Sequence, residues 1–172
     1  AKDYLVETLM LDPADAYSLV LLGNIYSRYE NNYDRAEKFY RRAIEITPDD
    51  PILLTNYGAL MTERHNNEQA TEFFERAIQA NPRYPNAYYA LALLSMQEAN
   101  LTDALATLDD LFAKADASDI RSLPLYAEAR RLYLDANQFL ATGSAREMMD
   151  TVEQRRKELE QEGNVPIRMI ED

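Results

Sequence analysis

A repeat of about 34 residues constrains this chain more than any other feature. The intervals between Pro13, Pro48 and Pro82 are 35 and 34 residues, and Asp116 stands a further 34 residues on. Small and large residues recur in the same register: Gly23, Gly58 and Ala92, then Ala36, Ala70 and Ala104, then Tyr40, Phe74 and Leu108. A fixed period of this length predicts a stacked array of helix pairs, in which each repeat buries its apolar face against its neighbours.

Each repeat is expected to contain two helices. The first helices are predicted over residues 16–29, 51–64 and 85–98, and the second helices over residues 34–46, 68–80 and 102–115. Asp15 and Asp50 are suited to cap helix N-termini, and Pro51 and Pro85 fit the first helical position, where no N–H is needed. The turns between helices hold residues that tolerate left-handed dihedral angles: Asn31 and Asn32, His65 to Asn67, and Asn100.

The recurring small residues indicate where the two helices of a pair cross. A large side chain at Gly23, Gly58 or Ala92 would hold the first helix away from the second. The alanines of the second helix supply the matching surface, and the large residues fill the space one turn later. The pattern therefore predicts one small-to-large contact in every repeat.

Together these positions resemble the tetratricopeptide repeat (TPR) family. The matching residues are Leu19, Leu22, Gly23, Tyr26, Ala36, Tyr40, Ala43 and Pro48; then Leu54, Tyr57, Gly58, Met61, Ala70, Phe74, Ala77 and Pro82; then Tyr88, Leu91, Ala92, Ser95, Ala104, Leu108, Leu111 and Asp116. The resemblance covers residues 14–115. It implies an all-α fold, a right-handed α-α superhelix (solenoid) of TPR helix pairs.

The register divides the chain into six predicted segments. Residues 1–13 are expected to be the C-terminal helix of a truncated preceding repeat, so that the chain is a fragment or a processed product. Three repeats follow over residues 14–50, 51–84 and 85–118. Residues 119–163 are predicted to form a degenerate TPR-like helix pair and capping helix. The repeat frame places Ala141 in the second helix but needs a few inserted residues, and residues 123–140 are themselves typical of one amphipathic helix. Gly143 is expected to stop that helix, and Ser144 and Glu147 form a capping box that opens the next one. The tail, residues 164–172, alternates in polarity but is too short to assign.

The net charge of −12 narrows the range of partners. Phosphate backbones bind clustered Lys and Arg, which this chain lacks, so nucleic acid and anionic membranes are poor candidates. A basic or neutral protein or peptide fits better, although the charge could serve solubility alone. No apolar stretch is long enough for membrane insertion. The composition leaves the cellular compartment open.

Catalytic and metal chemistry find little support in the sequence. There is no Cys, and the one His, His65, falls in a turn without partners that would make it a base or a ligand. The acidic pairs Asp49-Asp50 and Asp109-Asp110 are adjacent in sequence and do not face each other across a cleft, as acid–base pairs must. No phosphate-binding glycine loop occurs. The chain is therefore predicted to be no enzyme and to carry no metal and no cofactor.

The resemblance implies a concave groove lined by the first helices, which binds a partner peptide or helix. The groove positions are Tyr17, Val20, Asn24, Ser27 and Arg28; Thr55, Ala59 and Thr62, with Ile52 and Glu63; and Asn86, Tyr89, Leu93 and Met96, with Gln97. Chaperone-binding members of the family grip a C-terminal carboxylate with two asparagines and several cations. Asn24 and Asn56 match the asparagines, but the cation positions hold Val20, Asn86 and Ala90, so this mode is not expected.

The predicted function is a TPR protein–protein interaction module, acting as a scaffold or adaptor. Two alternatives stay open. The repeats could be a structural spacer or a self-association arm of a larger protein, or they could regulate an enzyme domain outside residues 1–172.

Overall fold

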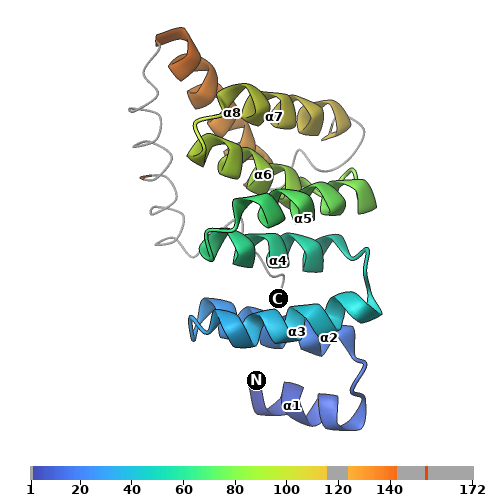
Figure 1. Ribbon diagram of the computed structural model, residues 1–172. Helices are drawn as coiled ribbons and strands as arrows, with labels where there is room; N and C mark the ends of the chain where they lie inside the picture. The colour runs from blue at the N-terminus through green and yellow to red at the C-terminus, as the bar shows by residue number, and fades with distance from the viewer. Residues whose placement is uncertain (1, 116–123, 143–153, 155–172) are drawn as a thin grey trace. The chain divides into compact units, whose positions relative to one another are not determined.

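The computed structural model describes residues 2–115, 124–142 and 154, and they fall into two compact units that meet in sequence at Ala80 and Asn81. Eight helices make up these residues, and no strand occurs among them (Figure 1). The N-terminal unit holds α1 (Lys2–Leu11), α2 (Ala16–Arg28), α3 (Tyr33–Ile46), α4 (Pro51–Glu63) and α5 (Asn67–Ala80). The C-terminal unit holds α6 (Pro85–Gln97), α7 (Leu101–Ala115) and α8 (Pro124–Thr142).

The predicted helices of the three repeats are confirmed, with ends that differ by one residue from those expected. Asp15 and Asp50 cap α2 and α4, as predicted. The Asp15 carboxylate accepts from the backbone N–H of Ser18 at 3.1 Å, and that of Asp50 accepts from Ile52 at 2.8 Å and from Leu53 at 3.3 Å. These bonds satisfy N–H groups that have no partner within the helix, which fixes where each first helix begins.

The left-handed turns predicted between the helices are confirmed at Asn31 and His65, whereas the other predicted asparagines do not have left-handed dihedral angles. The left-handed residues are Asn31, His65 and Ala99, each of which directly precedes an asparagine. The three following asparagines are N-caps of the second helices: Asn32 accepts from Arg35 at 3.2 Å, Asn66 from Gln69 at 3.3 Å, and Asn100 from Asp103 at 3.3 Å. A short side-chain oxygen two or three residues before an exposed N–H is well placed to cap it, and this preference explains the 34-residue spacing of these asparagines.

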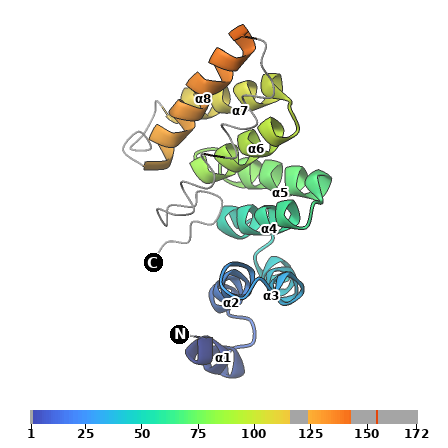
Figure 2. The ribbon, with the colours of Figure 1, turned by 90° about the vertical axis from the view of Figure 1, so that its left-hand side faces the viewer.

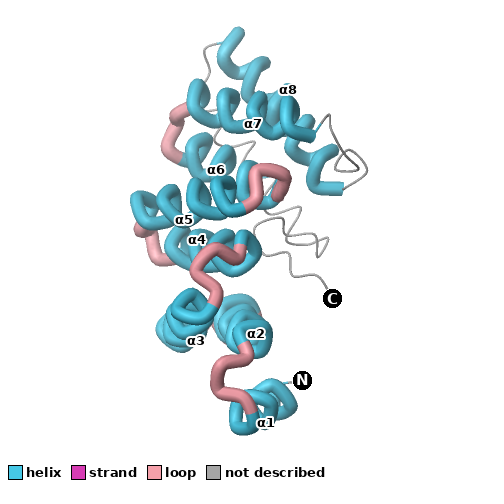
Figure 3. Tube along the Cα trace, turned by 90° about the vertical axis from the view of Figure 1, so that its right-hand side faces the viewer, coloured by secondary structure: helices cyan, strands magenta, loops and turns pink. Residues whose placement is uncertain are grey.

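Each first helix lies beside the second helix of its own repeat, as α2 and α3 do in Figure 3. At Gly23 an added Cβ would lie 2.5 Å from the Tyr40 ring, and at Gly58 it would lie 2.6 Å from the Phe74 ring. Both distances are much shorter than the separation of about 3.5–4 Å between carbon atoms in contact. The glycines therefore allow the helices to approach until the aromatic ring of the second helix covers the backbone of the first.

In the N-terminal unit, α1 packs against α2 through Leu5 and through Lys2. The Lys2 ammonium pairs with Glu30 at 2.5 Å and lies 4.3 Å above the centre of the Tyr26 ring. Tyr4, Met10 and Leu11 are exposed on the same helix. Figure 2 shows α1 next to the α2 end of this unit.

In the C-terminal unit, α8 packs against both α6 and α7. Among the α8 side chains that the structure describes, Ala129, Leu132 and Ala136 are buried, and the Tyr133 ring meets the Phe112 ring edge-on at 5.4 Å. Helix α8 confirms the amphipathic helix predicted over residues 123–140. The frame that placed Ala141 in a second helix is wrong, because α8 continues without a break to Thr142. The predicted capping box at Ser144 and Glu147 and the tail lie outside the described residues.

Candidate partner-binding surface

The predicted groove positions on α2 form one stripe along the helix. Tyr17 is 65% exposed and Arg28 is half-buried, whereas Val20 and Ser27 are buried. Asn24, between them, is 2% exposed. Residues three, four and seven apart share a helix face, so α2 presents an exposed tyrosine and a buried amide on the same side.

The corresponding face of α4 carries smaller side chains. Ala59 and Thr55 are buried, and Thr62 and Ile52 are half-buried. Both threonine hydroxyls donate back to their own helix, from Thr55 to the Pro51 carbonyl at 2.7 Å and from Thr62 to the Gly58 carbonyl at 3.3 Å. Their hydroxyl hydrogens are therefore already used within α4.

In the C-terminal unit, most of the predicted groove residues on α6 lie inside the protein. Tyr89, Leu93 and Met96 are all buried, with Tyr89 at 1% and Met96 at 0% exposure. Asn86 is half-buried, and its Nδ2 donates to the Tyr84 hydroxyl at 3.2 Å. Of the five predicted positions on α6, only Asn86 and Gln97 are thus partly accessible.

Two buried asparagine amides lack a hydrogen-bond partner for their nitrogen. Within the part of the chain that the structure describes, these are Nδ2 of Asn24 on α2 and Nδ2 of Asn56 on α4. The helices that carry them are in contact in the N-terminal unit. A buried donor left unpaired costs about 1–3 kcal/mol, and native proteins contain few of them. Sequence reasoning noted the positions of both residues but could not show that their donors stay unpaired.

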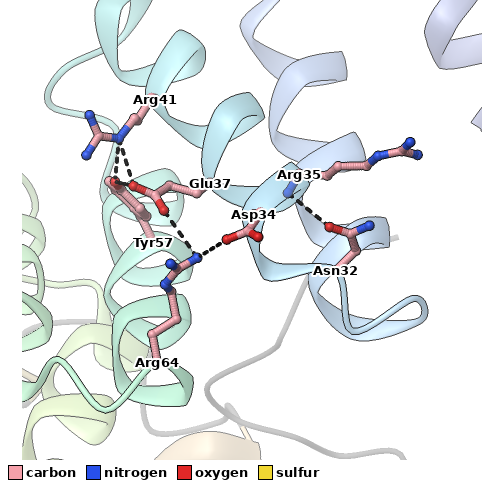
Figure 4. A network of polar contacts seen from close by, with 7 residues as sticks. All are labelled: Asn32, Asp34, Arg35, Glu37, Arg41, Tyr57 and Arg64. Atoms are coloured by element: carbon pink, nitrogen blue, oxygen red, sulfur yellow. Dashed lines mark hydrogen bonds and ion pairs between the residues drawn. The ribbon is translucent and has the colours of Figure 1, made fainter.

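A polar network joins α3 to α4 in the N-terminal unit (Figure 4). The Arg41 Nε donates to Glu37 at 2.9 Å and to the Tyr57 hydroxyl at 3.2 Å, and that hydroxyl donates to Glu37 at 3.3 Å. Arg64 completes the network, with contacts of 2.7 Å to Asp34 and 3.3 Å to Glu37. The network connects the second helix of one repeat to the first helix of the next.

The same network shifts the ionisation of its members. Burial raises the pKa of Tyr57 above its usual value, and the hydrogen bond from Arg41 acts in the opposite direction. The hydrogen bond to Tyr57 raises the pKa of Arg41, and the hydrogen bond to Asp34 raises that of Arg64. Tyr57 occupies a repeat position that is Leu22 in the first repeat and Leu91 in the third. A hydroxyl at this otherwise apolar position was the one feature of the sequence that indicated the network.

The described residues offer neither a metal-binding cluster nor a membrane-spanning helix. No group of three or more His, Cys, Asp or Glu side chains is placed to hold a metal ion there. None of the described helices has the length and apolar character needed to cross a bilayer. His65 is exposed, in the left-handed turn between α4 and α5.

Comparison with known proteins identifies the family. Sequence models of the tetratricopeptide repeat match residues 18–54 and 61–129. The chain therefore belongs to the TPR family, whose repeats form protein-interaction scaffolds.

A curated relative and two solved structures resemble the chain. The TPR repeat-containing thioredoxin TTL4 of Arabidopsis thaliana is 26% identical over 125 residues, and the match covers 73% of this chain but only 18% of that protein. The crystal structure of the MamA protein aligns with a TM-score of 0.59 at 17% identity, over 92% of this chain and 84% of MamA. This likeness shows the fold alone, an all-α helical-repeat solenoid. PilW, a type IV pilus biogenesis factor, aligns over 86% of this chain and 87% of its own at 21% identity, and its TM-score of 0.36 adds no further argument.

Proposed function

We propose that this chain is a protein-interaction module that binds an extended segment of a partner protein along α2 and α4, the first helices of the repeats in its N-terminal unit. The observation that carries the proposal is the stripe on α2, where the 65% exposed Tyr17 shares a face with the unpaired amide of Asn24. A large exposed aromatic side chain beside an unsatisfied donor offers both apolar area and a hydrogen bond to a ligand.

The charge of the N-terminal unit favours a neutral or basic partner. Residues 1–80 contain eight Lys and Arg against fourteen Asp and Glu. Complementary charge speeds association, so binding of a basic segment is expected to weaken as salt is added. The role is one of binding, and turnover by the isolated chain is not expected.

Peptide selection tests the proposal. The full chain is used to select binding peptides from a random library in which each peptide is an internal segment between two folded protein parts. The affinity of a selected peptide is then measured by fluorescence anisotropy. Tyr17→Ala should weaken binding by about tenfold, because a central aromatic contact is typically worth that much. Tyr29→Ala is the matched control, since Tyr29 is also exposed, at 77%, but lies at the end of α2 outside the stripe. Equal losses from the two substitutions, or no selected peptide at all, would refute the proposed function.

A further inference from the structure

The exposed side of α3 has a row of three positive charges. Arg35, Lys38 and Arg42 are exposed, and their spacing along the chain places them on one face of the helix. From Arg35 to Arg42 the helix rises by about 10 Å. Other residues separate the three in sequence, so they form no basic run, and only the helix brings them together. These three residues are called the α3 cation row below.

The α3 cation row has no counterpart in the second helices of the other two repeats. The equivalent positions are Gln69, Glu72 and Arg76 on α5, and Asp103, Ala106 and Asp110 on α7. Three cations make the row positive on α3, one acid and one base cancel on α5, and two acids make the same positions negative on α7. A feature that the helix packing requires would recur with the repeat, so the row is special to the first repeat.

Nearby carboxylates leave the α3 cation row uncompensated. Asp34 and Glu37 are paired within the polar network between α3 and α4. In the turn before α2, the carboxylates of Asp12 and Asp15 accept from backbone N–H groups. Glu45, the remaining acid of α3, is exposed. Within the described part of the chain, none of these carboxylates forms an ion pair with the row, so its three charges are available to an anion from outside.

Two members of the row are held in place by contacts that leave them accessible. Nη2 of Arg42 donates to the Pro13 carbonyl at 2.9 Å, and the guanidinium carbon of Arg35 lies 5.4 Å from the centre of the Tyr26 ring. In Figure 4 the Arg35 side chain points away from the polar network between α3 and α4. A guanidinium has five N–H donors, so most of those of Arg42 can still bind a carboxylate. Side chains that are already held in place lose less conformational freedom when they bind.

The spacing of the row favours an acidic helix as its partner. Carboxylates on one face of a second helix recur with the same rise of about 1.5 Å per residue, so they can match all three cations at once. Successive cations of the row are about 4.5 and 6 Å apart along the helix axis. Residues on one side of an extended strand are about 7 Å apart, so their carboxylates match the row less well.

The net charge of the chain favours a short acidic segment over a long polyanion such as nucleic acid. At physiological salt, charges more than about 8 Å apart are largely screened from each other. A short acidic helix on α3 therefore interacts mainly with the row. A nucleic acid needs many phosphate contacts, and it would extend past the acidic remainder of a chain whose net charge is −12.

We propose that the α3 cation row docks an acidic helix of a partner protein, at a surface separate from the one on α2 and α4. This inference goes beyond the proposed function and is independent of it. The first helices receive a neutral or basic segment, and the outer side of α3 receives an acidic helix. A single module then joins two partners of opposite charge.

Two designed peptides test the inference. The first is an alanine-based helical peptide whose glutamates lie on one face at the spacing of the row, and the second has the same composition with its glutamates spread around the helix. Fluorescence anisotropy with the full chain should show about tenfold tighter binding of the first peptide, and added salt should weaken that binding. Equal affinities of the two peptides, or no binding of either, would overturn the inference.

Single charge removals assign the binding to the row. Lys38→Gln should weaken binding of the one-faced peptide by about threefold, and Lys38→Arg should restore it. Arg42→Gln should cause a similar loss. Its matched control is Arg76→Gln, because Arg76 donates to the Pro48 carbonyl at 3.2 Å as Arg42 does to that of Pro13, but has no row beside it. Arg76→Gln should leave the affinity nearly unchanged, and equal losses from the two arginine variants would contradict the assignment.

Three controls distinguish the other occupants of this surface. A labelled oligonucleotide should bind more weakly than the one-faced peptide, and tighter binding would overturn the choice of a protein partner. Light scattering of the chain alone, at low salt, should show no association that depends on Lys38. Association that Lys38→Gln abolishes would assign the row to a second copy and overturn the proposal. Tyr17→Ala should leave the affinity for the one-faced peptide unchanged, and a loss would contradict the separation of the two surfaces.

Discussion

Replacement of Gly58 by alanine tests why the repeat requires a small residue at this position. The added Cβ would lie 2.6 and 2.7 Å from two atoms of the Phe74 ring and 3.2 Å from the Ala70 carbonyl oxygen. Carbon atoms in contact are about 3.5–4 Å apart, so the ring would have to move by about 1 Å. Phe74 is only 1% exposed and the Ala70 carbonyl belongs to the backbone of α5, so neither can move freely. Overpacking of this kind costs about 1–3 kcal/mol, and the higher helix propensity of alanine offsets about 1 kcal/mol of it.

We therefore expect Gly58→Ala to lower the free energy of unfolding by up to about 2 kcal/mol, measured by urea titration with circular dichroism. The third repeat suggests the remedy, since it has buried Ala92 and buried Leu108 at the equivalent positions. Phe74→Leu alone should destabilise the protein. In the Gly58→Ala background, the stability lost through Phe74→Leu should be smaller than in the wild-type background by at least about 1 kcal/mol. Strict additivity of the two substitutions, within about 0.5 kcal/mol, would refute the explanation from the ring contact.

Three further predictions concern the helix termini and the polar network. Asn66→Ala should destabilise the protein by about 1 kcal/mol through loss of the α5 cap, and Asn66→Asp should restore most of it; full stability of the alanine variant in a urea titration would argue against the cap. Ala99→Gly should raise the thermal midpoint, because Ala99 has a left-handed φ of 59° that costs alanine about 1 kcal/mol, whereas Ala106→Gly, inside α7, should lower it. The pKa of Tyr57 is raised in the folded state, so the folded state holds the Tyr57 proton more tightly than the unfolded state. The free energy of unfolding should therefore fall as the pH rises above about 10, and Tyr57→Phe should make that fall shallower. An identical dependence of stability on pH in the variant would contradict this.

The sequence predicts the helices well because backbone geometry and packing impose a strict period. The spacing of Gly23 and Gly58 identifies the helix crossings, and Asp50 and Pro51 identify a helix start. The amphipathic pattern of residues 123–140 and the stop at Gly143 likewise predict α8, whereas the repeat frame that assigns Ala141 to a second helix rests on spacing alone and fails.

The candidate surface is less predictable from the sequence, because periodicity assigns a residue to a helix face but not its depth. Tyr89 and Met96 were predicted on the same repeat face as Tyr17, which is exposed, yet both are buried. Whether the amide of Asn24 or Asn56 keeps an unpaired donor depends on the side chains around it, which the repeat pattern does not specify. The contact of Tyr57 with Arg41 likewise joins residues from different repeats.

Nuclear magnetic resonance of the full chain with the selected peptide tests the central claim most directly. Peptide binding along the first helices predicts shifts for the backbone of Tyr17 and for the side-chain amide groups of Asn24 and Asn56, with little change at Lys38 and Arg42 on the exposed side of α3. Shifts confined to Lys38, Arg42 and their neighbours on α3, with both asparagine side chains unchanged, would contradict the account.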